Sequence, residues 1–150
     1  MIFEYLNSLY SPPSGWTSVS CCYIAPLSNQ LTFEIAVQVD DSGYWRLDDI
    51  SAKQRQGELL SNGGFESNLT NWTLTTYANV TTLLIEPDFQ SLTAQSGVTY
   101  LYASSANARS YLKQTFSVVT GENVLISFFW DYFPAFGFPF GISELIVTLT

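Results

Sequence analysis

Apolar and polar residues alternate in short stretches along almost the whole chain, and this pattern constrains the fold more than any other feature. In LTFEIAVQV (residues 31–39) the apolar side chains recur at every second position, and polar residues such as Glu34 and Gln38 lie between them. A period of two is that of a β-strand with one buried and one exposed face. The turn-forming sequence DDSG follows, and then YWRLDDIS, so these two stretches are expected to form a hairpin.

The same pattern, with boundaries at Gly, Pro, Asn and Ser, predicts strands throughout the sequence. They are expected at residues 2–9, 17–24, 31–39, 44–52, 59–61, 72–76, 81–85, 99–104, 108–119, 123–132 and 144–150. No helix longer than one turn is expected. Short strands at this spacing are typical of two antiparallel sheets packed face to face. The predicted fold class is therefore an all-β, two-sheet antiparallel β-sandwich of the jelly-roll type.

The length of 150 residues fits one domain with a substantial core. Charged residues make up only 12% of the chain, against about 25% in typical globular domains, and aromatic residues reach 16%. Polar side chains are therefore scarce for a surface of ordinary size. Either the core is large for a chain of this length, or another copy of the protein covers part of the apolar surface.

The charge of the chain argues against several classes of partner. The net charge is −8 and the five Lys and Arg residues are scattered singly, so no basic patch can neutralise nucleic-acid phosphates. Nucleic acid is therefore not expected as a partner. Anionic membrane surfaces are disfavoured by the same charge, and no apolar run has the length that spanning a bilayer requires, so membrane insertion is not expected.

The side chains of most enzyme active sites are missing from this sequence. The chain has no His, which excludes Ser-His-Asp and Cys-His arrangements, and it has no Gly-rich phosphate loop. A carboxylate pair acting on a glycoside is the remaining catalytic alternative, but no pair of acidic residues stands out. The protein is therefore not expected to be an enzyme.

Two adjacent cysteines, Cys21 and Cys22, lie in the strand-like run WTSVSCCYIA. Neighbouring residues of a strand point to opposite faces, so one thiol is expected inside the protein and the other outside. The outer thiol could bridge to another subunit. Zinc binding is not expected, because the chain has neither a CxxC pair nor a His.

Several segments together resemble one known family. They are LLSNGGFES, NLTNWT, SYLKQTFSV, NVLISFFW and SELIVTLT, followed in cyclic order by SGWTSVSCCYIAP, LTFEIAVQVDD and GYWRLDDIS. In this order they resemble galactose-binding-like jelly rolls of the carbohydrate-binding-module type. In that family NGGFE opens the domain and LDDIS closes it, so this chain resembles one jelly roll in permuted order. Residues 1–53 then correspond to the closing half, 54–58 to a linker, and 59–150 to the opening half.

The resemblance also implies a location and a cofactor. Such domains often occur as tandem repeats in secreted proteins, so the protein is expected to be extracellular or at the cell surface. Related jelly rolls often hold a structural Ca²⁺ where the opening and closing strands meet, and there Asp48, Asp49 and Glu66 would supply oxygen ligands. In the alternative, Asp48 faces solvent while Asp49 and Glu66 accept hydrogen bonds from backbone amides.

Three N-glycosylation sequons lie close together, at Asn68, Asn71 and Asn79. Their clustering would place glycans on one outward face of a secreted protein. Modification is least expected at Asn71, because Trp72 beside it is expected to pack inward.

The run WDYFPAFGFPFG is unusually rich in aromatic residues. It contains Trp130, Tyr132, Phe133, Phe136, Phe138 and Phe140. Its Pro and Gly residues disfavour regular strand pairing, so the run is expected to form a loop. The aromatics could stack on sugar rings, fill a pocket on a neighbouring subunit, or fold back over the core. The interface is favoured, because Asp131 is the only hydrogen-bonding neighbour that a sugar would find among them.

Both ends of the chain are apolar and β-prone, where polar tails would be expected. In the family pattern ELIVTLT is followed directly by the counterpart of MIFEYL, so these two strands should be neighbours in one jelly roll. They pair either within one chain, as a circular permutation, or between copies. Left unpaired, such edges would invite strand addition. Exchange between copies is favoured, because the linker at residues 54–58 is short and the low charge content demands extra buried surface. The residues expected in the exchange are Ile2, Phe3, Tyr5, Leu145, Ile146 and Val147.

The expected function is therefore structural. The protein is predicted to be a subunit or repeat of an extracellular filament, whose copies join head to tail by strand complementation and aromatic contacts. Such a contact is heterologous and does not close on itself, so it propagates. The alternative is a carbohydrate-binding module that works as a monomer or as one bead of an array, with glycans as its partners.

Overall fold

A computed structural model describes residues 3–6, 15–38, 43–76, 82–87, 92–104, 109–134 and 143–150. This part of the chain contains strands and turns but no helix, and so nothing helical that could cross a membrane. The strands are β1 (Phe3–Leu6), β2 (Thr17–Ile24), β3 (Gln30–Gln38), β4 (Gly43–Gln54), β5 (Gly57–Glu58), β6 (Thr73–Thr76), β7 (Thr82–Pro87), β8 (Thr99–Ser104), β9 (Ser110–Ser117), β10 (Asn123–Pro134) and β11 (Glu144–Leu149).

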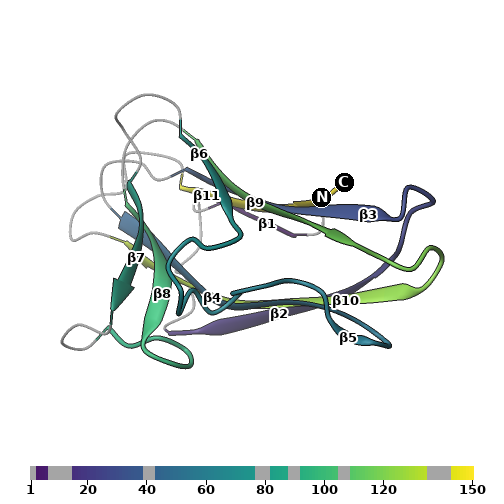
Figure 1. Cartoon of the computed structure of the whole chain (residues 1–150). Helices are drawn as coiled ribbons and strands as arrows, with labels where there is room; N and C mark the ends of the chain where they lie inside the picture. The colour runs from purple at the N-terminus through teal and green to yellow at the C-terminus, as the bar shows by residue number, and fades with distance from the viewer. Residues whose placement is uncertain are drawn as a thin grey trace.

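These strands form two antiparallel sheets that pack face to face, so the predicted all-β sandwich is confirmed (Figure 1). The first sheet, sheet A, has the strand order β1-β11-β3-β9-β6. The second, sheet B, has the order β2-β10-β4-β8-β7, with β5 attached to β4. In both sheets, strands from the first third of the chain lie between strands from the rest. A single chain therefore completes both layers of the sandwich.

The expected hairpin between residues 31–39 and 44–52 is wrong, because β3 and β4 lie in opposite sheets. β3 pairs with β11 and β9, whereas β4 pairs with β10 and β8. Each strand has one fully buried apolar face, to which Phe33 of β3 and Trp45 of β4 belong. In opposite sheets these two faces meet across the interior, and the Trp45 indole N–H donates to the Gln38 carbonyl oxygen at 3.4 Å.

Most strand boundaries agree with the pattern, and the exceptions lie near the middle and end of the chain. Residues 59–61 do not form a strand. Leu60 is instead a buried core residue that follows a tight turn and the two-residue strand β5. The expected linker, residues 54–58, is thus part of the hairpin between β4 and β5. β10 continues to Pro134, two residues beyond the expected end.

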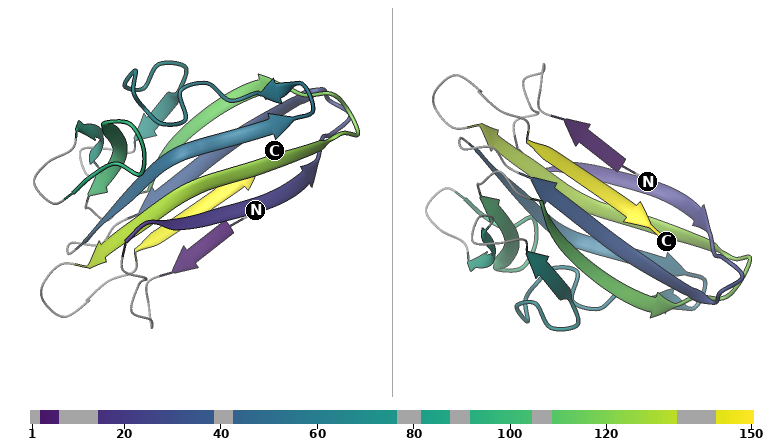
Figure 2. Two further views of the ribbon diagram at one scale, coloured as in Figure 1. Left: turned by 90° about the horizontal axis from the view of Figure 1, so that it is seen from below. Right: turned by 90° about the horizontal axis from the view of Figure 1, so that it is seen from above.

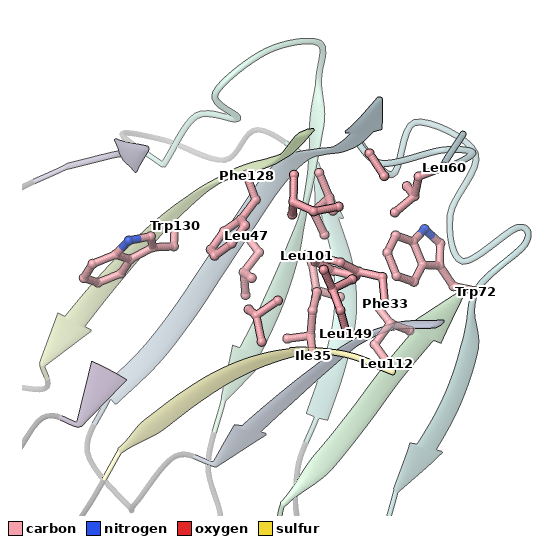
Figure 3. Close-up of a cluster of buried hydrophobic side chains, with 14 of the residues drawn as sticks. Phe33, Ile35, Leu47, Leu60, Trp72, Leu101, Leu112, Phe128, Trp130 and Leu149 are labelled. Atoms are coloured by element: carbon pink, nitrogen blue, oxygen red, sulfur yellow. The ribbon is translucent and has the colours of Figure 1, made fainter. Parts of the chain in front are cut away.

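The core fills the space between the two sheets. Figure 3 shows Ile35 and Leu112 of sheet A opposite Leu47 and Leu101 of sheet B, and all four side chains are fully buried. Burial of each such side chain contributes roughly 1.5–3 kcal/mol. Trp72, which precedes β6, seals one end, with its ring centroid 6.2 Å from that of Phe33. The inward packing of Trp72 that the sequence predicts is confirmed.

The two cysteines point to opposite faces of edge strand β2, as predicted. Cys21 is half-buried and packs against the core, whereas Cys22 is exposed, and both thiols are free. Burial raises the pKa of the Cys21 thiol, and the neighbouring Cys22 adds to this effect. Cys22 is therefore the more accessible of the two thiols.

Candidate functional site

The opening and closing motifs meet at a β-bulge in β4. The pairing of β4 with β10 shifts register between Ser127 and Phe129, and Asp49 at this point has a φ of 51°. Beyond the bulge, the Ile50 N–H donates to the Gly63 carbonyl oxygen at 3.1 Å. A Cβ atom at residue 63 would overlap the Ile50 carbonyl oxygen, so only Gly allows the NGGFES loop to lie this close to β4.

Asp48 is fully buried beside the bulge and holds the loop that precedes β8. Its Oδ2 atom accepts hydrogen bonds from the amides of Gln95, at 2.8 Å, and Ser96, at 3.3 Å. Its Oδ1 atom accepts from the Asp49 amide at 2.8 Å. Burial raises the pKa of the Asp48 carboxyl to about 6 against the opposing effect of these amides. The alternative expectation is wrong for Asp48, which does not face solvent, but its backbone-amide contacts for Glu66 are confirmed.

Glu66 holds the same loop from the other side. Its Oε1 atom accepts from the amides of Val98, at 2.8 Å, and Thr99, at 3.0 Å. These two hydrogen bonds lower the pKa of the Glu66 carboxyl. Gly97, directly before Val98, has a φ of 65°, and a Cβ atom there would overlap the Glu66 carboxylate. Asp49 makes the third link, because its Oδ1 atom accepts from the Ser96 hydroxyl at 2.7 Å.

This geometry does not fit the Ca²⁺ site that the family resemblance implies. The Asp48 and Glu66 carboxylates accept backbone N–H groups, and donors directed at those oxygens oppose a cation. Within the described residues, no group of three or more acidic, Cys or His side chains could hold a metal ion. The predicted ligands are brought together, but their oxygens bind the loop of residues 95–99 instead of converging on one point.

A polar pocket of about 420 Å³ lies beside this junction, on the outer face of sheet B. We call it the β4–β5 pocket. Its lining residues come from β4, β5, β10 and the NGGFES loop, and they are Asp49, Ile50, Ser51, Lys53, Glu58, Leu60, Asn62, Gly63, Gly64 and Ser127. All of these residues except Ser127 come from one continuous segment, residues 49–64, and the fold adds Ser127 from β10.

The aromatic run near the end of the chain is not a loop at its start. Trp130 and Tyr132 lie on the inner face of β10, only 3% and 4% exposed, and pack against Trp45. They are core residues, which corrects the expected interface role. Phe133 points to the outer face, where it stacks on Tyr44 with ring centroids 4.9 Å apart. Phe136, Phe138 and Phe140 lie outside the described residues.

Sequence patterns did not reveal a buried ion pair between Arg46 and Asp131 on the outer face of sheet B. The Arg46 guanidinium lies 4.7 Å from the Trp16 ring centroid and 5.0 Å from that of Phe133. It also donates to the Thr93 carbonyl oxygen at 3.0 Å. The available signal was a single charge within each of two aromatic stretches, YWRL and FFWDYF. The pair fixes a second point of the loop that Asp48 and Glu66 hold.

Two of the three predicted glycosylation sites are described, and both are exposed. Asn68 and Asn71 lie in the turns between Asn62 and Trp72, with φ values of 54° and 69°. The Asn62 side-chain amide donates to the Asn68 carbonyl oxygen at 2.7 Å and so shapes this loop. Asn79 lies outside the described residues.

The predicted strand-exchange residues pair within the single chain. Phe3 is opposite Val147 and Tyr5 is opposite Leu145 in the β1–β11 pair, while Glu4 is opposite Ile146. The two ends are thus neighbours in one sandwich, as the family order implies (Figure 2). Ile2 lies outside the described residues. Exchange of β1 between copies stays a prediction.

Comparison of this chain with protein-family models, curated proteins and solved structures finds no match.

Proposed function

We propose that the protein is a structural subunit of an extracellular filament, built on a permuted galactose-binding-like jelly roll, whose copies join head to tail by exchanging β1. One observation carries this proposal. Within the described residues β1 is a four-residue edge strand whose only strand partner is β11. Detaching a short edge strand with one strand partner requires little free energy. Detachment leaves β11 as an open edge that can pair with the β1 strand of another copy.

The exchange requires no new kind of contact. A β1 strand from a neighbour would occupy the same register on β11, so each pair broken within a chain is remade between chains. The free-energy difference between the monomer and the strand-exchanged assembly then depends mainly on the segment between β1 and β2 and on the concentration of the protein. Because each copy donates a strand at one place and accepts one at another, the contact is heterologous and continues from copy to copy.

The edge of sheet B on the same side of the sandwich supports an assembly role. β2 and β1 lie at this side (Figure 2), and β2 is an edge strand of eight residues without charge or Pro. Monomeric β-proteins usually protect such edges with charged residues, Pro or a covering element. This side of the sandwich therefore suits contact with a second copy better than exposure to solvent.

A reversible lock on β1 tests the proposal. Residues 4 and 146 are directly opposite in the β1–β11 register, and opposite residues of antiparallel strands are close enough for a disulfide. We expect the Glu4→Cys/Ile146→Cys variant, in a Cys21→Ala/Cys22→Ser background, to stay monomeric when oxidised. After reduction it should form fibres visible by electron microscopy, because β1 is then free to exchange.

The matched controls are the Cys21→Ala/Cys22→Ser background itself and the two single-cysteine variants, which should form fibres under both conditions. Mass spectrometry verifies that the intramolecular disulfide has formed. Fibres of normal length from the oxidised double variant would show that β1 exchange is the wrong account. Isolated globules under every condition would instead favour the monomeric carbohydrate-binding alternative.

The extracellular location is part of the same proposal. The exposed positions of Asn68 and Asn71 support it, because a glycan at either site would project away from the core. Peptide mass spectrometry of natively produced protein, after enzymatic release of N-glycans in heavy water, should mark Asn68. Unmarked sequon peptides would remove this support.

A further inference from the structure

We propose that the β4–β5 pocket is the docking site for an arginine side chain of a basic partner protein. The pocket measures about 420 Å³, which lies within the range of about 300–1,000 Å³ typical of small-molecule sites and leaves room for one long side chain. The inference goes beyond the proposed filament, because the pocket lies on the outer face of sheet B and uses neither β1 nor β11.

The charge of the whole chain favours a basic partner. The chain has 13 Asp and Glu residues against five Lys and Arg residues, and its net charge is −8. Three of the five basic side chains already form ion pairs within the chain. The basic residues of the chain therefore cannot balance its acidic ones. Such a surface attracts cationic partners over a long range and accelerates their association.

The walls of the pocket are fixed by hydrogen bonds within the chain. Glu58 fixes the hairpin wall, because its Oε1 atom accepts from the Ala52 amide at 2.7 Å and its Oε2 atom accepts from the Ser51 hydroxyl at 2.7 Å. The opposite wall is fixed by the hydrogen bond from the Ile50 amide to the Gly63 carbonyl oxygen at 3.1 Å. A site with rigid walls loses little conformational entropy when a side chain binds in it.

Asp49 supplies the acceptor that the chain itself leaves open. Its Oδ1 atom accepts from the Ser96 hydroxyl at 2.7 Å, and among the described residues no hydrogen bond reaches its Oδ2 atom. Both oxygens of Glu58 are already hydrogen-bonded, so Glu58 mainly adds negative charge. Ser127 adds a hydroxyl oxygen from β10. The pocket therefore offers a carboxylate and a hydroxyl oxygen from two different strands to a group with several N–H donors.

The position of Lys53 indicates that the pocket attracts a cation without binding this one firmly. The Lys53 Nζ atom approaches Glu58 Oε2 only to 3.9 Å, which is beyond hydrogen-bond distance, and the Lys53 side chain is 58% exposed. An exposed ion pair of this kind contributes little free energy. A cation with better geometry can therefore displace the Lys53 ammonium from the rim of the pocket.

The geometry favours a guanidinium over other cations. A metal ion needs several oxygens that converge on one point, and within the described residues no group of three or more acidic, Cys or His side chains could hold one. A guanidinium carries five N–H donors in a planar fork, whereas an ammonium is a strongly hydrated point charge. Leu125 lies directly opposite Lys53 and is 43% exposed, so it offers an apolar surface to the aliphatic stem of an arginine.

Nuclear magnetic resonance titration of the oxidised, β1-locked monomer tests the site without interference from fibres. The probe is N-acetyl-L-arginine amide, and N-acetyl-L-citrulline amide is the neutral control of the same shape, with sodium chloride added to equalise the ionic strength. We expect the arginine derivative to shift, saturably at millimolar concentration, the amide signals of residues 49–53, 58–64 and 127, while those of β9 stay unchanged. The citrulline derivative should bind at least about tenfold more weakly, because it makes no charge-assisted hydrogen bond. If the lock fails, dilute parent protein kept below the concentration of fibre formation serves instead.

Two variants connect binding to the pocket. Asp49→Asn keeps a residue that tolerates the positive φ and an oxygen that can accept from Ser96, so the fold should be preserved. We expect it to bind the arginine derivative about tenfold more weakly, as for loss of one hydrogen bond to a charged group. Lys53→Met removes the competing ammonium and should bind the derivative more tightly than the parent does, a gain that damage to the fold would not produce. The matched control is Lys113→Met, which changes the net charge by the same amount at an exposed position of sheet A and should bind less tightly than Lys53→Met.

Each remaining outcome overturns the proposal. Spectra that the arginine derivative leaves unchanged, or changes no more than the citrulline derivative does, would exclude a pocket selective for cations. Equal affinities of the parent, Asp49→Asn and Lys53→Met would place binding elsewhere. Tighter binding of uncapped L-arginine than of the capped derivative would assign the pocket to a free amino acid instead of a protein side chain. Shifts of the same residues by calcium chloride, with no response to the arginine derivative, would identify a metal site. None of these results bears on filament formation, which the disulfide lock tests separately.

Discussion

Asp48 and Glu66 hold the same loop, yet their surroundings act on their charges in opposite directions. Asp48 is fully buried, and burial outweighs the three amides that favour its ionised form. Glu66 is exposed, so the amides of Val98 and Thr99 dominate. One acid is therefore stabilised in its protonated form and the other in its ionised form. The stability of the junction should depend on pH through both residues, with opposite signs.

The Asp48 contribution should be lost as the pH rises. Its pKa is about 6 in the folded protein and near 3.8 in the unfolded chain, so between these values the folded state binds more protons. Protonated Asp48 therefore contributes at most about 3 kcal/mol to the free energy of unfolding. This contribution is present in full below about pH 4 and is lost as the pH rises through 6. We expect urea unfolding of the parent, relative to Asp48→Asn, to show this loss between pH 4 and pH 7.

Glu66→Gln is the matched control with the opposite sign. The pKa of Glu66 is lowered by folding, so its contribution is present above the unfolded pKa and is lost as the pH falls. Relative to Glu66→Gln, the parent should therefore lose stability on acidification. Parallel stability profiles of the parent and Asp48→Asn would contradict the assignment for Asp48.

At the scale of elements, the two edges on one side of the sandwich differ in length and composition. β1 has four residues and includes Glu4, whereas β2 has eight residues and no charge. The outward side chains of β2 are Ser18, Ser20, Cys22 and Ile24, and all of them are exposed. A long uncharged edge favours sideways association through strand pairing, in addition to the end-to-end contact through β1.

A charge in the middle of β2 should reduce sideways association. We expect Ser20→Lys to lower the light scattering of concentrated protein and to thin fibre bundles in electron micrographs, while single fibres still form. The reason is that Lys on an edge strand opposes pairing with a second edge. Ser117→Lys, an equivalent change on β9, should behave like the parent. Equal scattering from all three proteins would show that β2 is not a lateral contact.

The whole molecule is one folding unit, because its two segments alternate within both sheets. β3, from the first segment, lies between β11 and β9 of the second, and β4 lies between β10 and β8. Neither residues 1–53 nor residues 59–150 can therefore bury the apolar faces of their strands alone. The turn at residues 55–56 joins them through the β4–β5 hairpin.

A chain cut in this turn tests that organisation. We expect each fragment alone to lack cooperative unfolding, and the two mixed fragments to regain a β-sheet circular dichroism spectrum with one thermal transition. Separated strands with open apolar faces are not stable, whereas the recombined fragments restore every pair of both sheets. The uncut chain is the reference. Two independent transitions in the uncut chain would show that the segments fold as separate domains.

The alternation of side chains in the sequence predicted most of the strands and, for the strand at residues 31–39, the face that is buried. Side-chain alternation is a local property, so the opposite orientations of Cys21 and Cys22, and the inward face of β3 around Phe33, follow from the period of a strand. The inward packing of Trp72 was also predictable. In the same way, the cyclic order of the motifs predicted the neighbouring positions of β1 and β11.

Only the folded structure revealed the partners of β3 and β4 and most contacts of the buried polar residues. Pairing depends on contacts between distant residues, so a turn-like DDSG could not reveal that β3 and β4 separate into opposite sheets. The ion pair of Arg46 and Asp131 joins residues 85 positions apart, and the β4–β5 pocket brings Ser127 of β10 beside residues of the 49–64 segment. Amide contacts of Glu66 were one of the two alternatives from the sequence, but only the position of the loop before β8 determined that a buried Asp48 accepts the amides of Gln95 and Ser96. A local pattern does not encode which distant donor reaches a carboxylate oxygen.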